Sequence, residues 1–210
     1  MSNSNVVIYG TGGFAREVLC LLHDLGAHAQ VLGFMEPDAV VDEKYRDARI
    51  MGLPVLRESQ FDPQNTEMVV GVGDPTIRQR IVDGLPATTR HRTLVHPSAV
   101  VSQWVTLGEG VIVCAGTILT CQIGIGKYCH LNLLTTVGHD CTMGDYFTTA
   151  PGVNISGNCT FADRVYFGTS AATRQGVTSV SDVVVGMGAM VVKNLSEPGV
   201  YVGTPAKKIK

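Results

Sequence analysis

The sequence has almost no net charge, few aromatic residues and no long apolar run. Its formal net charge is -2 over 210 residues, which gives no electrostatic reason to expect nucleic acid or an anionic membrane surface as a partner. No apolar run reaches the roughly 18 residues that a membrane-spanning helix needs. The opening stretch MSNSNVVIYGTGGFAREV lacks a basic leader, so we expect no signal peptide and a cytoplasmic protein.

Cysteine pairs of the CxxC type are also missing. The spacing of the six cysteines therefore disfavours a zinc or dithiol redox site, and we expect no metal. Reduced, buried thiols that fill space as small apolar side chains are the simpler interpretation. The cysteines are Cys20, Cys114, Cys121, Cys129, Cys141 and Cys159.

Two patterns divide the chain. In residues 1–92, apolar β-rich runs alternate with helical spacing, as in NVVIYG, FAREVLCLLHDLG, AQVLGFME and TEMVVGVGDPTIRQRIVDGL. This alternation predicts a small α/β unit with a parallel sheet, a Rossmann-like half domain. Such a half domain is too short for NAD but suits a nucleoside diphosphate. The glycine-rich turn GTGGFA after the first predicted strand is fit to hold a phosphate at a helix N-terminus.

Within residues 93–210, a six-residue period starts at Val95 and runs for 17 hexads. Of the 17 consecutive hexads, 14 begin with Val, Leu, Ile, Met or Phe, and the fifth position is small or apolar throughout. The exceptions at the first position are Thr149, Thr173 and Ser179. A period of six fits neither an α-helix nor a hairpin meander. It fits a parallel β-helix in which three hexads close a triangular coil of about 18 residues.

The array resembles the left-handed β-helix of the hexapeptide-repeat acyltransferases. Left-handedness rests on that resemblance, because crossover rules favour the right-handed choice. The whole chain resembles the PglD-like N-acetyltransferases of nucleotide-linked 4-amino sugars, within the NeuD-type family of sugar O- and N-acyltransferases. The matching segments are YGTGGFAREV, GVGDPTIRQRI, VHPSAVVS, NLLTTVGHDCTMGD and GVYVGTPAKKIK. The resemblance implies a homotrimer that uses acetyl-CoA, binds the nucleotide sugar in residues 1–92, and transfers the acetyl group between neighbouring β-helices.

The segment TTVGHDCTMGD carries the candidate catalytic residues. N-acetylation needs a base that removes a proton from the amine and a hydrogen-bond donor that stabilises the oxyanion. His139 occupies the third position of its hexad, where the side chain is expected to point outward. One coil further along, Gly157 is expected to stack about 4.8 Å away and to leave a backbone N–H free for a ligand.

The resemblance assigns the role of base to His139 and that of oxyanion donor to Gly157. It makes Asp140 the partner that orients His139 and raises its basicity. Adjacent residues on a strand face opposite sides, so His139 and Asp140 can meet only where a corner turns the backbone.

Further residues are candidates for substrate and coenzyme binding. Glu36, at the end of the second predicted strand, is expected to contact a base or ribose, and Gly73 and Asp74 lie in a loop that is expected to contact the same nucleotide. The resemblance adds substrate contacts by Gly12, Gly13, Phe14 and Asn132, and coenzyme contacts, mostly through backbone groups, by Thr148, Gly157, Thr169 and Met187. Two positions depart from the family pattern. Phe14 replaces a common histidine and cannot hydrogen-bond a phosphate, and the segment MEPD replaces adjacent aspartates.

We therefore predict N-acetylation of the C4 amine of a nucleotide-linked 4-amino-4,6-dideoxy sugar, with UDP, GDP and dTDP left open. O-acetylation of a sugar such as sialic acid would use the same base. A catalytically silent binding scaffold would keep the array and the nucleotide site, but the intact set of His139, Asp140 and Gly157 argues against it. A zinc site like that of γ-class carbonic anhydrases would need a histidine five residues after His139, where the chain has Gly144.

Overall fold

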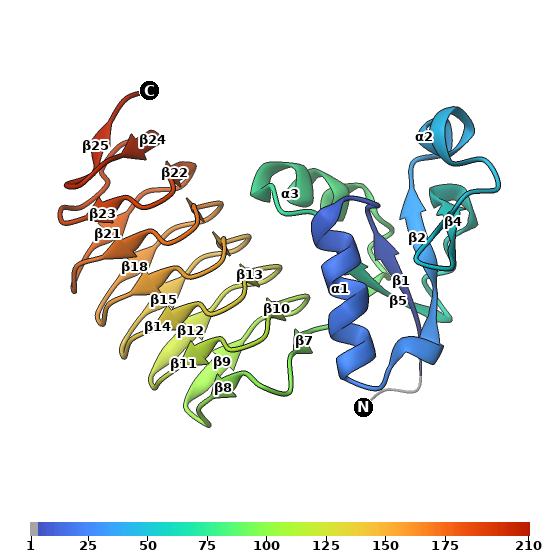
Figure 1. Ribbon diagram of the computed structural model, residues 1–210, viewed down its shortest axis with the longest axis horizontal. Helices are drawn as coiled ribbons and strands as arrows, with labels where there is room; N and C mark the ends of the chain where they lie inside the picture. Colours follow the sequence, from blue (N-terminus) through green and yellow to red (C-terminus); the bar gives the residue numbers. More distant parts are fainter. Residues whose placement is uncertain (1–3) are drawn as a thin grey trace. The chain divides into compact units, whose positions relative to one another are not determined.

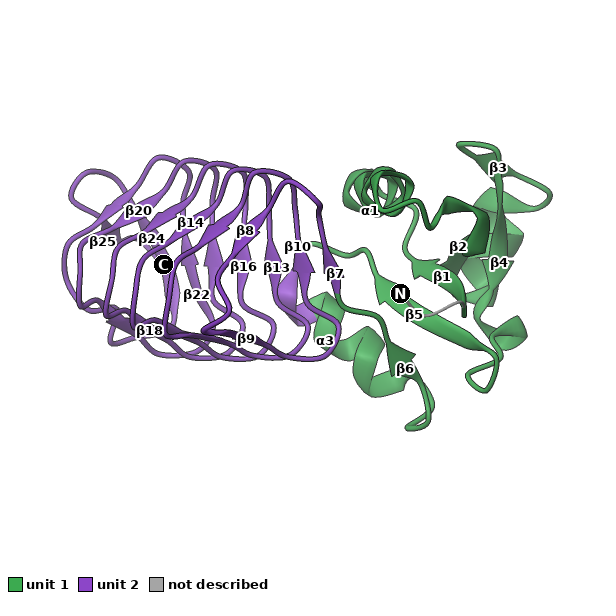
Figure 2. Ribbon diagram, turned by 90° about the horizontal axis from the view of Figure 1, so that it is seen from below, with its two compact units in different colours: residues 1–73, 77–93 green, residues 74–76, 94–210 purple. Residues whose placement is uncertain are grey.

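The computed structural model describes residues 4–210, which form two compact units (Figure 2). Unit 1 comprises the described residues up to 73 together with 77–93, and unit 2 comprises 74–76 and 94–210. Among the described residues, no helix combines the length and the apolar character that crossing a bilayer requires.

Unit 1 is the predicted α/β unit (Figure 1). Its sheet has the order β3-β4-β2-β1-β5-β6, with β1 parallel to both β2 and β5 and only β3 antiparallel to its neighbour. Its elements are β1 (Asn5–Tyr9), α1 (Gly13–Asp24), the 3-10 turn His28–Gln30, β2 (Val31–Glu36), α2 (Asp38–Val40), the π-helical turn Val41–Tyr45, β3 (Arg49–Ile50), β4 (Leu53–Arg57), the 3-10 turn Glu58–Gln60, β5 (Thr66–Val70), α3 (Pro75–Gly84) and β6 (Arg90–His91).

Helix α1 buries one apolar stripe and ends at a glycine. Its buried side chains recur at helical spacing and include Ala15, Val18 and Leu22. Gly26 follows the last turn with φ at +70°, and its N–H donates to the His23 carbonyl oxygen over 2.8 Å. A left-handed residue just past the end is the usual way to close a helix, and glycine adopts that conformation at little cost.

The parallel pairing of β1, β2 and β5 brings three loops to one edge of the sheet. Because β1 lies between β2 and β5, the carboxyl ends at Tyr9, Glu36 and Val70 face the same side. The predicted phosphate turn follows the first of these ends. In open parallel α/β sheets, ligands bind at this carboxyl edge.

Unit 2 is a parallel β-helix of three faces (Figure 1). The first face comprises β7 (Leu94–Val95), β10 (Ile112–Val113), β13 (His130–Leu131), β16 (Thr148–Thr149), β19 (Tyr166–Phe167), β22 (Val183–Val185), β24 (Gly199–Val202) and β25 (Lys207–Lys208). The second comprises β8 (Val100–Val101), β11 (Ile118–Leu119), β14 (Thr136–Val137), β17 (Asn154–Ile155), β20 (Ala172–Thr173) and β23 (Met190–Val191). The third comprises β9 (Val105–Leu107), β12 (Ile123–Ile125), β15 (Thr142–Met143), β18 (Thr160–Phe161) and β21 (Thr178–Ser179).

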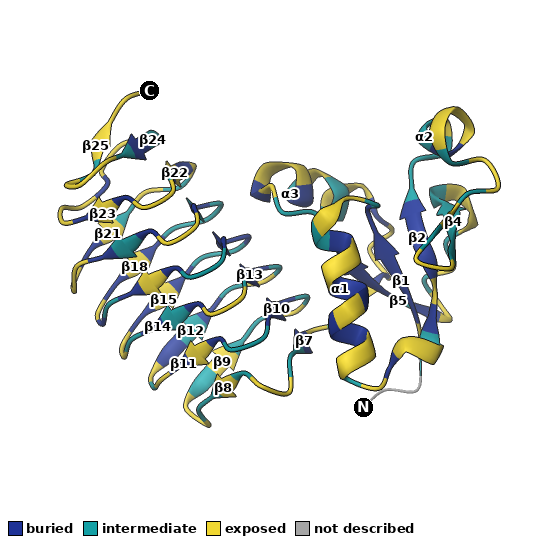
Figure 3. Ribbon diagram, viewed as in Figure 1, coloured by how far each residue is buried: buried dark blue, intermediate teal, exposed yellow. Residues whose placement is uncertain are grey.

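Strand register confirms the predicted coil length. Ile118 pairs with Thr136, and Thr136 pairs with Asn154, so each coil advances the chain by 18 residues. The first and fifth hexad positions point inward and form one continuous apolar core. Figure 3 shows the resulting alternation of buried and exposed residues along the strands. The polar exception Thr149 is also buried, and its hydroxyl oxygen accepts a hydrogen bond from the Asn132 N–H at 3.0 Å.

The corners lie at the fourth hexad position, which the sequence pattern does not reveal. Nine non-glycine residues there have φ between 54° and 61°, and the glycines at the same position, such as Gly116 and Gly152, are also left-handed. A left-handed conformation costs an L-residue about 1–2 kcal/mol, and here the hydrogen bonds between stacked coils hold it in place. Asp140 is one of these corner residues, with φ at +59°.

Candidate active site

His139 lies on the corner between the second and third faces, after β14 and before β15. Its side chain is 51% exposed, in agreement with the outward direction predicted from its hexad position. The stacked coils fix its place: the Asp140 N–H donates to the Cys121 carbonyl oxygen of the preceding coil at 3.1 Å, and the Asn158 N–H donates to the His139 carbonyl oxygen at 2.8 Å. The backbone that carries the imidazole is therefore fixed on both sides.

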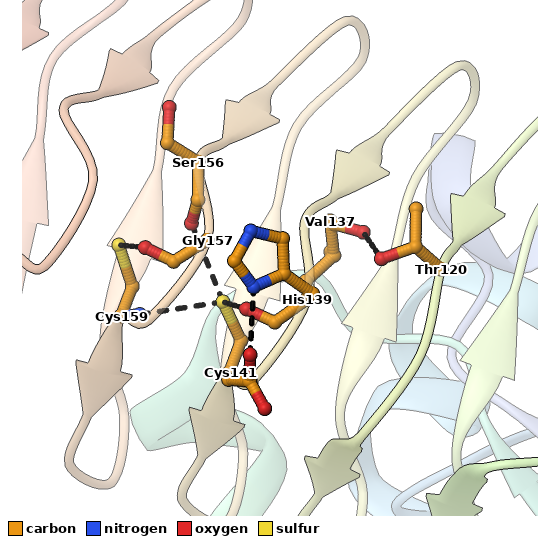
Figure 4. A network of polar contacts seen from close by, with 8 residues as sticks. Thr120, Val137, His139, Cys141, Ser156, Gly157 and Cys159 are labelled. Atoms are coloured by element: carbon orange, nitrogen blue, oxygen red, sulfur yellow. Dashed lines mark hydrogen bonds and ion pairs between the residues drawn. The ribbon is translucent and has the colours of Figure 1, made fainter.

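Gly157 lies directly beside the His139 ring (Figure 4). A Cβ placed on Gly157 would lie 2.7 Å from Nε2 and 2.8 Å from Cε1 of the imidazole. Real side chains do not approach so closely, so only glycine leaves room for the ring in this position. Within residues 4–210, the structure shows no hydrogen bond from the Gly157 N–H. The backbone of Gly157, which carries no side chain, thus lies next to Nε2 of His139, the nitrogen that would act as the base.

Asp140 and His139 meet although they are consecutive residues. The carboxylate oxygen Oδ2 lies 2.7 Å from Nδ1 of the imidazole, because the left-handed corner turns the Asp140 side chain back along the chain. A carboxylate can only accept, so Nδ1 carries the proton in this pair. Nε2 is then left with the lone pair, which lies in the plane of the ring, while Gly157 lies over the ring face next to Nε2.

Two buried thiols support this corner from inside the β-helix. Cys141 and Cys159 occupy successive coils in the fifth hexad position, and the Cys159 N–H donates to the Cys141 sulfur at 3.4 Å. The hydrogen bond to Cys159 and burial raise the pKa of the Cys141 thiol, which therefore stays protonated at neutral pH. These two cysteines are apolar filling, as predicted. The prediction of buried thiols is wrong for Cys20, which is exposed on α1, and for Cys121, which is only half-buried on the same corner as His139.

Asp140→Asn is expected to lower the rate of acetyl transfer about 10–100-fold, the range for a lost hydrogen bond to a charged group. Asparagine tolerates the left-handed corner, so the fold is retained, but its amide can present either oxygen or nitrogen to Nδ1 and no longer fixes the tautomer. The measurement is kcat/KM for the variant beside its melting temperature. An unchanged rate would show that Asp140 does not assist His139 in catalysis.

A cavity of about 420 Å³ opens at the carboxyl edge of the sheet in unit 1. All five candidate residues in this unit line it, namely Gly12, Gly13, Phe14, Glu36 and Gly73. Helix α1 begins there, and its N-cap Gly12 supplies no side-chain cap, so this end of the helix has the geometry of an anion site. Its first turn also contains no acidic residue. The cavity thus combines a phosphate-binding geometry with apolar walls.

Hydroxyl groups in and near this cavity were not predicted. Thr11 Oγ1 donates to Glu36 Oε1 at 2.7 Å and lies 3.2 Å from the Tyr45 hydroxyl oxygen. Tyr9 donates to Glu58 Oε2 at 2.8 Å, and burial together with this bond raises the pKa of Tyr9, so that the phenol keeps its proton. Thr11 stands in the quoted GTGGFA turn and could have been proposed. Tyr45 ends the π-helical turn Val41–Tyr45, a segment that carries no sequence signal.

Two candidate substrate residues lie outside the cavity. Asp74 precedes α3 and accepts a hydrogen bond from the Thr76 N–H at 2.9 Å, which caps the helix. Asn132 is in unit 2, on the corner between the first and second faces, where its side-chain oxygen accepts from the Leu133 N–H at 2.7 Å. Within one chain, Asn132 and His139 are therefore on different corners of the β-helix.

The candidate coenzyme residues divide in the same way. Gly157 lies beside His139, whereas Thr169 and Met187 stack on the corner between the first and second faces, where the Gly188 N–H donates to the Thr169 carbonyl oxygen. Met187 is 81% exposed. Thr148 lies on the first face and is buried, and its hydroxyl donates to the Tyr146 carbonyl oxygen. A single chain does not bring these positions into one site.

Metal-ligating side chains do not gather anywhere in the described residues. No group of three or more His, Cys, Asp or Glu side chains there has a spacing that could hold an ion. His130 lies on β13 in the first face, on a different side of the β-helix from His139.

Comparisons with known proteins cover nearly the whole chain. A family profile for the PglD N-terminal domain matches residues 5–85. GDP-perosamine N-acetyltransferase of Escherichia coli O157:H7 is 30% identical over 174 residues, which are 81% of this chain and 78% of that protein. The acetyltransferase domain of PglB from Neisseria gonorrhoeae FA1090 superimposes with a TM-score of 0.89 at 27% identity and covers 98% of this chain and 100% of its own.

A perosamine N-acetyltransferase from Caulobacter crescentus, solved with CoA and GDP-perosamine after replacement of a histidine by asparagine, superimposes with a TM-score of 0.88 at 30% identity. The match covers 100% of this chain and 98% of that one. These similarities confirm the predicted order of an α/β unit and a left-handed β-helix, and they confirm the prediction of an acyltransferase. The chain belongs to the PglD-like family of nucleotide-aminosugar acetyltransferases.

Proposed function

We propose that the protein transfers an acetyl group from acetyl-CoA to the C4 amine of a nucleotide-linked 4-amino-4,6-dideoxy sugar. The observation that carries this proposal is the corner of unit 2, where the Nε2 side of His139 lies over Gly157 while Nδ1 is held by Asp140. The cavity of unit 1 supplies the nucleotide site. Two of the relatives named above are a GDP-perosamine N-acetyltransferase and a perosamine N-acetyltransferase solved with CoA and GDP-perosamine.

The chemistry follows from the positions of the protons. His139 Nε2 accepts a proton as the amine nitrogen attacks the thioester carbonyl carbon, and Asp140 stabilises the imidazolium that forms. The carbonyl oxygen becomes an oxyanion, which the Gly157 N–H stabilises by donating a hydrogen bond. The tetrahedral intermediate collapses, the C–S bond breaks, and the imidazolium returns its proton to the departing sulfur. The products are an amide and CoA with a free thiol.

This proposal is tested by the release of free CoA thiol from acetyl-CoA. The acceptors are UDP-, GDP- and dTDP-linked 4-amino sugars, and sialic acid serves as the comparison for O-acetylation. Turnover with one of the amino sugars is expected. Activity with sialic acid alone would instead support O-acetylation, and binding of a nucleotide sugar without any turnover would support a non-catalytic scaffold.

A homotrimer completes the coenzyme site in this proposal. His139 and the candidate coenzyme residue Met187 lie on different corners of one β-helix, so they share a groove only if two copies lie side by side. The second face carries the exposed apolar side chains Val100 and Ile118, which pair in register and are 60% and 41% exposed. Trp104 on the next corner is 59% exposed. Contiguous apolar surface of this kind is typical of an interface.

The trimer is tested by light scattering after size-exclusion chromatography. We expect a mass three times the 22.4 kDa of one chain. Replacing both Val100 and Ile118 by glutamate should yield monomers without acetyl transfer, because charges would be buried at the interface. Thr142→Glu, an exposed position on the third face, is the matched control and should remain trimeric. A wild-type monomer with full activity would contradict the proposal.

A further inference from the structure

Resting on the function proposed above, we infer that Glu36, held in place by Thr11 and Tyr45, selects a ribonucleoside diphosphate over its 2′-deoxy counterpart. Glu36 is the last residue of β2 and lines the cavity together with the GTGG turn. A diphosphate at the N-terminus of α1 places the attached pentose near the end of the neighbouring strand. A carboxylate at that place in a parallel α/β fold accepts hydrogen bonds from ribose hydroxyls.

The hydrogen-bond network around Glu36 orients its carboxylate. The Thr11 hydroxyl has one proton, and it donates that proton to Glu36 Oε1 because a carboxylate can only accept. The Tyr45 hydroxyl oxygen lies 3.2 Å from Thr11 Oγ1, a longer contact in which Thr11 is again on the donor side. This chain leads from Tyr45 through Thr11 to Glu36 and ties the β1–α1 turn to the end of β2. In the described residues, no hydrogen bond to Glu36 Oε2 is formed, so that oxygen is available to a ligand hydroxyl.

The charge of Glu36 indicates which part of the ligand it contacts. A carboxylate repels a phosphate, so Glu36 fits the hydroxyl-bearing part of the nucleotide rather than the diphosphate. The vicinal hydroxyls of ribose can both donate to a carboxylate, whereas a 2′-deoxyribose offers only one donor. Loss of one hydrogen bond to a charged group lowers affinity about 10-fold or more. Thr11 and Tyr45 are positioning residues in this arrangement, because they act through Glu36.

The test is calorimetric titration of the full-length protein with GDP, 2′-deoxy-GDP, UDP and 2′-deoxy-UDP. We expect the wild type to bind each ribonucleotide about 10-fold more tightly than its 2′-deoxy partner. Glu36→Gln and Thr11→Val should reduce this ratio to near one. Thr11→Ser keeps the hydroxyl and should restore the ratio, and Tyr45→Phe should give an intermediate value. Thr142→Val in unit 2 is the control and should leave the ratio unchanged.

Two results would overturn the inference. Equal affinity of the wild type for both members of each pair would show that the 2′-hydroxyl is not recognised. A preference for ribose over 2′-deoxyribose that persists in Glu36→Gln would assign Glu36 to another contact, such as the base. The same conclusion would follow if Glu36→Gln changed only the affinity for GDP relative to that for UDP. If none of the four nucleotides bound, the nucleotide site of the proposed function itself would fail, which is a distinguishable result.

Discussion

Replacing His139 by alanine is expected to lower kcat/KM for acetyl transfer about 10²–10⁴-fold, the contribution typical of a general base. At this corner, Nε2 of His139 lies next to the Gly157 backbone. It keeps its lone pair because Asp140 accepts the hydrogen bond from the proton on Nδ1. Without it, the amine must lose its proton to solvent. Substrate affinity should change little, because the base acts mainly in the transition state.

The fold should not explain this loss. The His139 side chain is 51% exposed, and its removal opens no cavity in the core, so the free energy of unfolding should change by less than about 0.5 kcal/mol. A steady-state assay beside a thermal melt measures both quantities. Wild-type activity in His139→Ala would show that another group removes the proton.

Gly157→Ala is expected to lower kcat/KM about 10²–10³-fold, because it should remove most of the rate enhancement that the general base provides. The protein should stay folded. The added Cβ would lie 2.7 Å from Nε2, and the exposed ring is free to move aside, so the base would leave its position. Gly157 does not have a left-handed φ, so alanine fits its backbone. Alanine also keeps the backbone N–H that would stabilise the oxyanion. The expected loss of kcat/KM therefore reports on the displaced His139 ring and not on a missing oxyanion donor.

A double-mutant cycle checks this reason. If Gly157→Ala acts by displacing His139, it should cause almost no further loss in the His139→Ala background. The control is Gly124→Ala on the third face, where the nearest atom to the new Cβ is the Thr106 hydroxyl oxygen at 3.8 Å, and its activity should stay near that of the wild type. Additive losses in the double variant would mean that alanine at 157 disturbs the oxyanion or coenzyme contact instead.

The β-helix could be predicted from the sequence because its period is a direct consequence of its geometry. Every third hexad returns to the same face, so each inward position contacts the same apolar core. Thr149 shows that a polar residue can also take an inward position when a backbone N–H donates a hydrogen bond to its hydroxyl oxygen. The stacking of Gly157 on His139 followed from the same arithmetic. These are features that depend on register alone.

Other features depend on side-chain and backbone geometry that the period does not encode. The contact between Asp140 and His139 requires a left-handed corner, and the fourth hexad position is occupied by residues as different as Leu134, Asp140 and Arg164. The separation of Met187 from His139 follows from which corner each occupies within one chain. The bond from Thr11 to Glu36 joins residues 25 apart in sequence, and only the folded sheet brings them together.

The most direct test of the account is the fate of an isotope-labelled acetyl group supplied as acetyl-CoA with a nucleotide-linked 4-amino sugar. Wild type and His139→Ala would be followed in parallel by NMR and mass spectrometry of the product. The account predicts that the label appears as an amide on the C4 nitrogen with the wild type and that its appearance is slowed at least about 10²-fold in the variant. An ester product, or equal rates of amide formation by the two proteins, would contradict it.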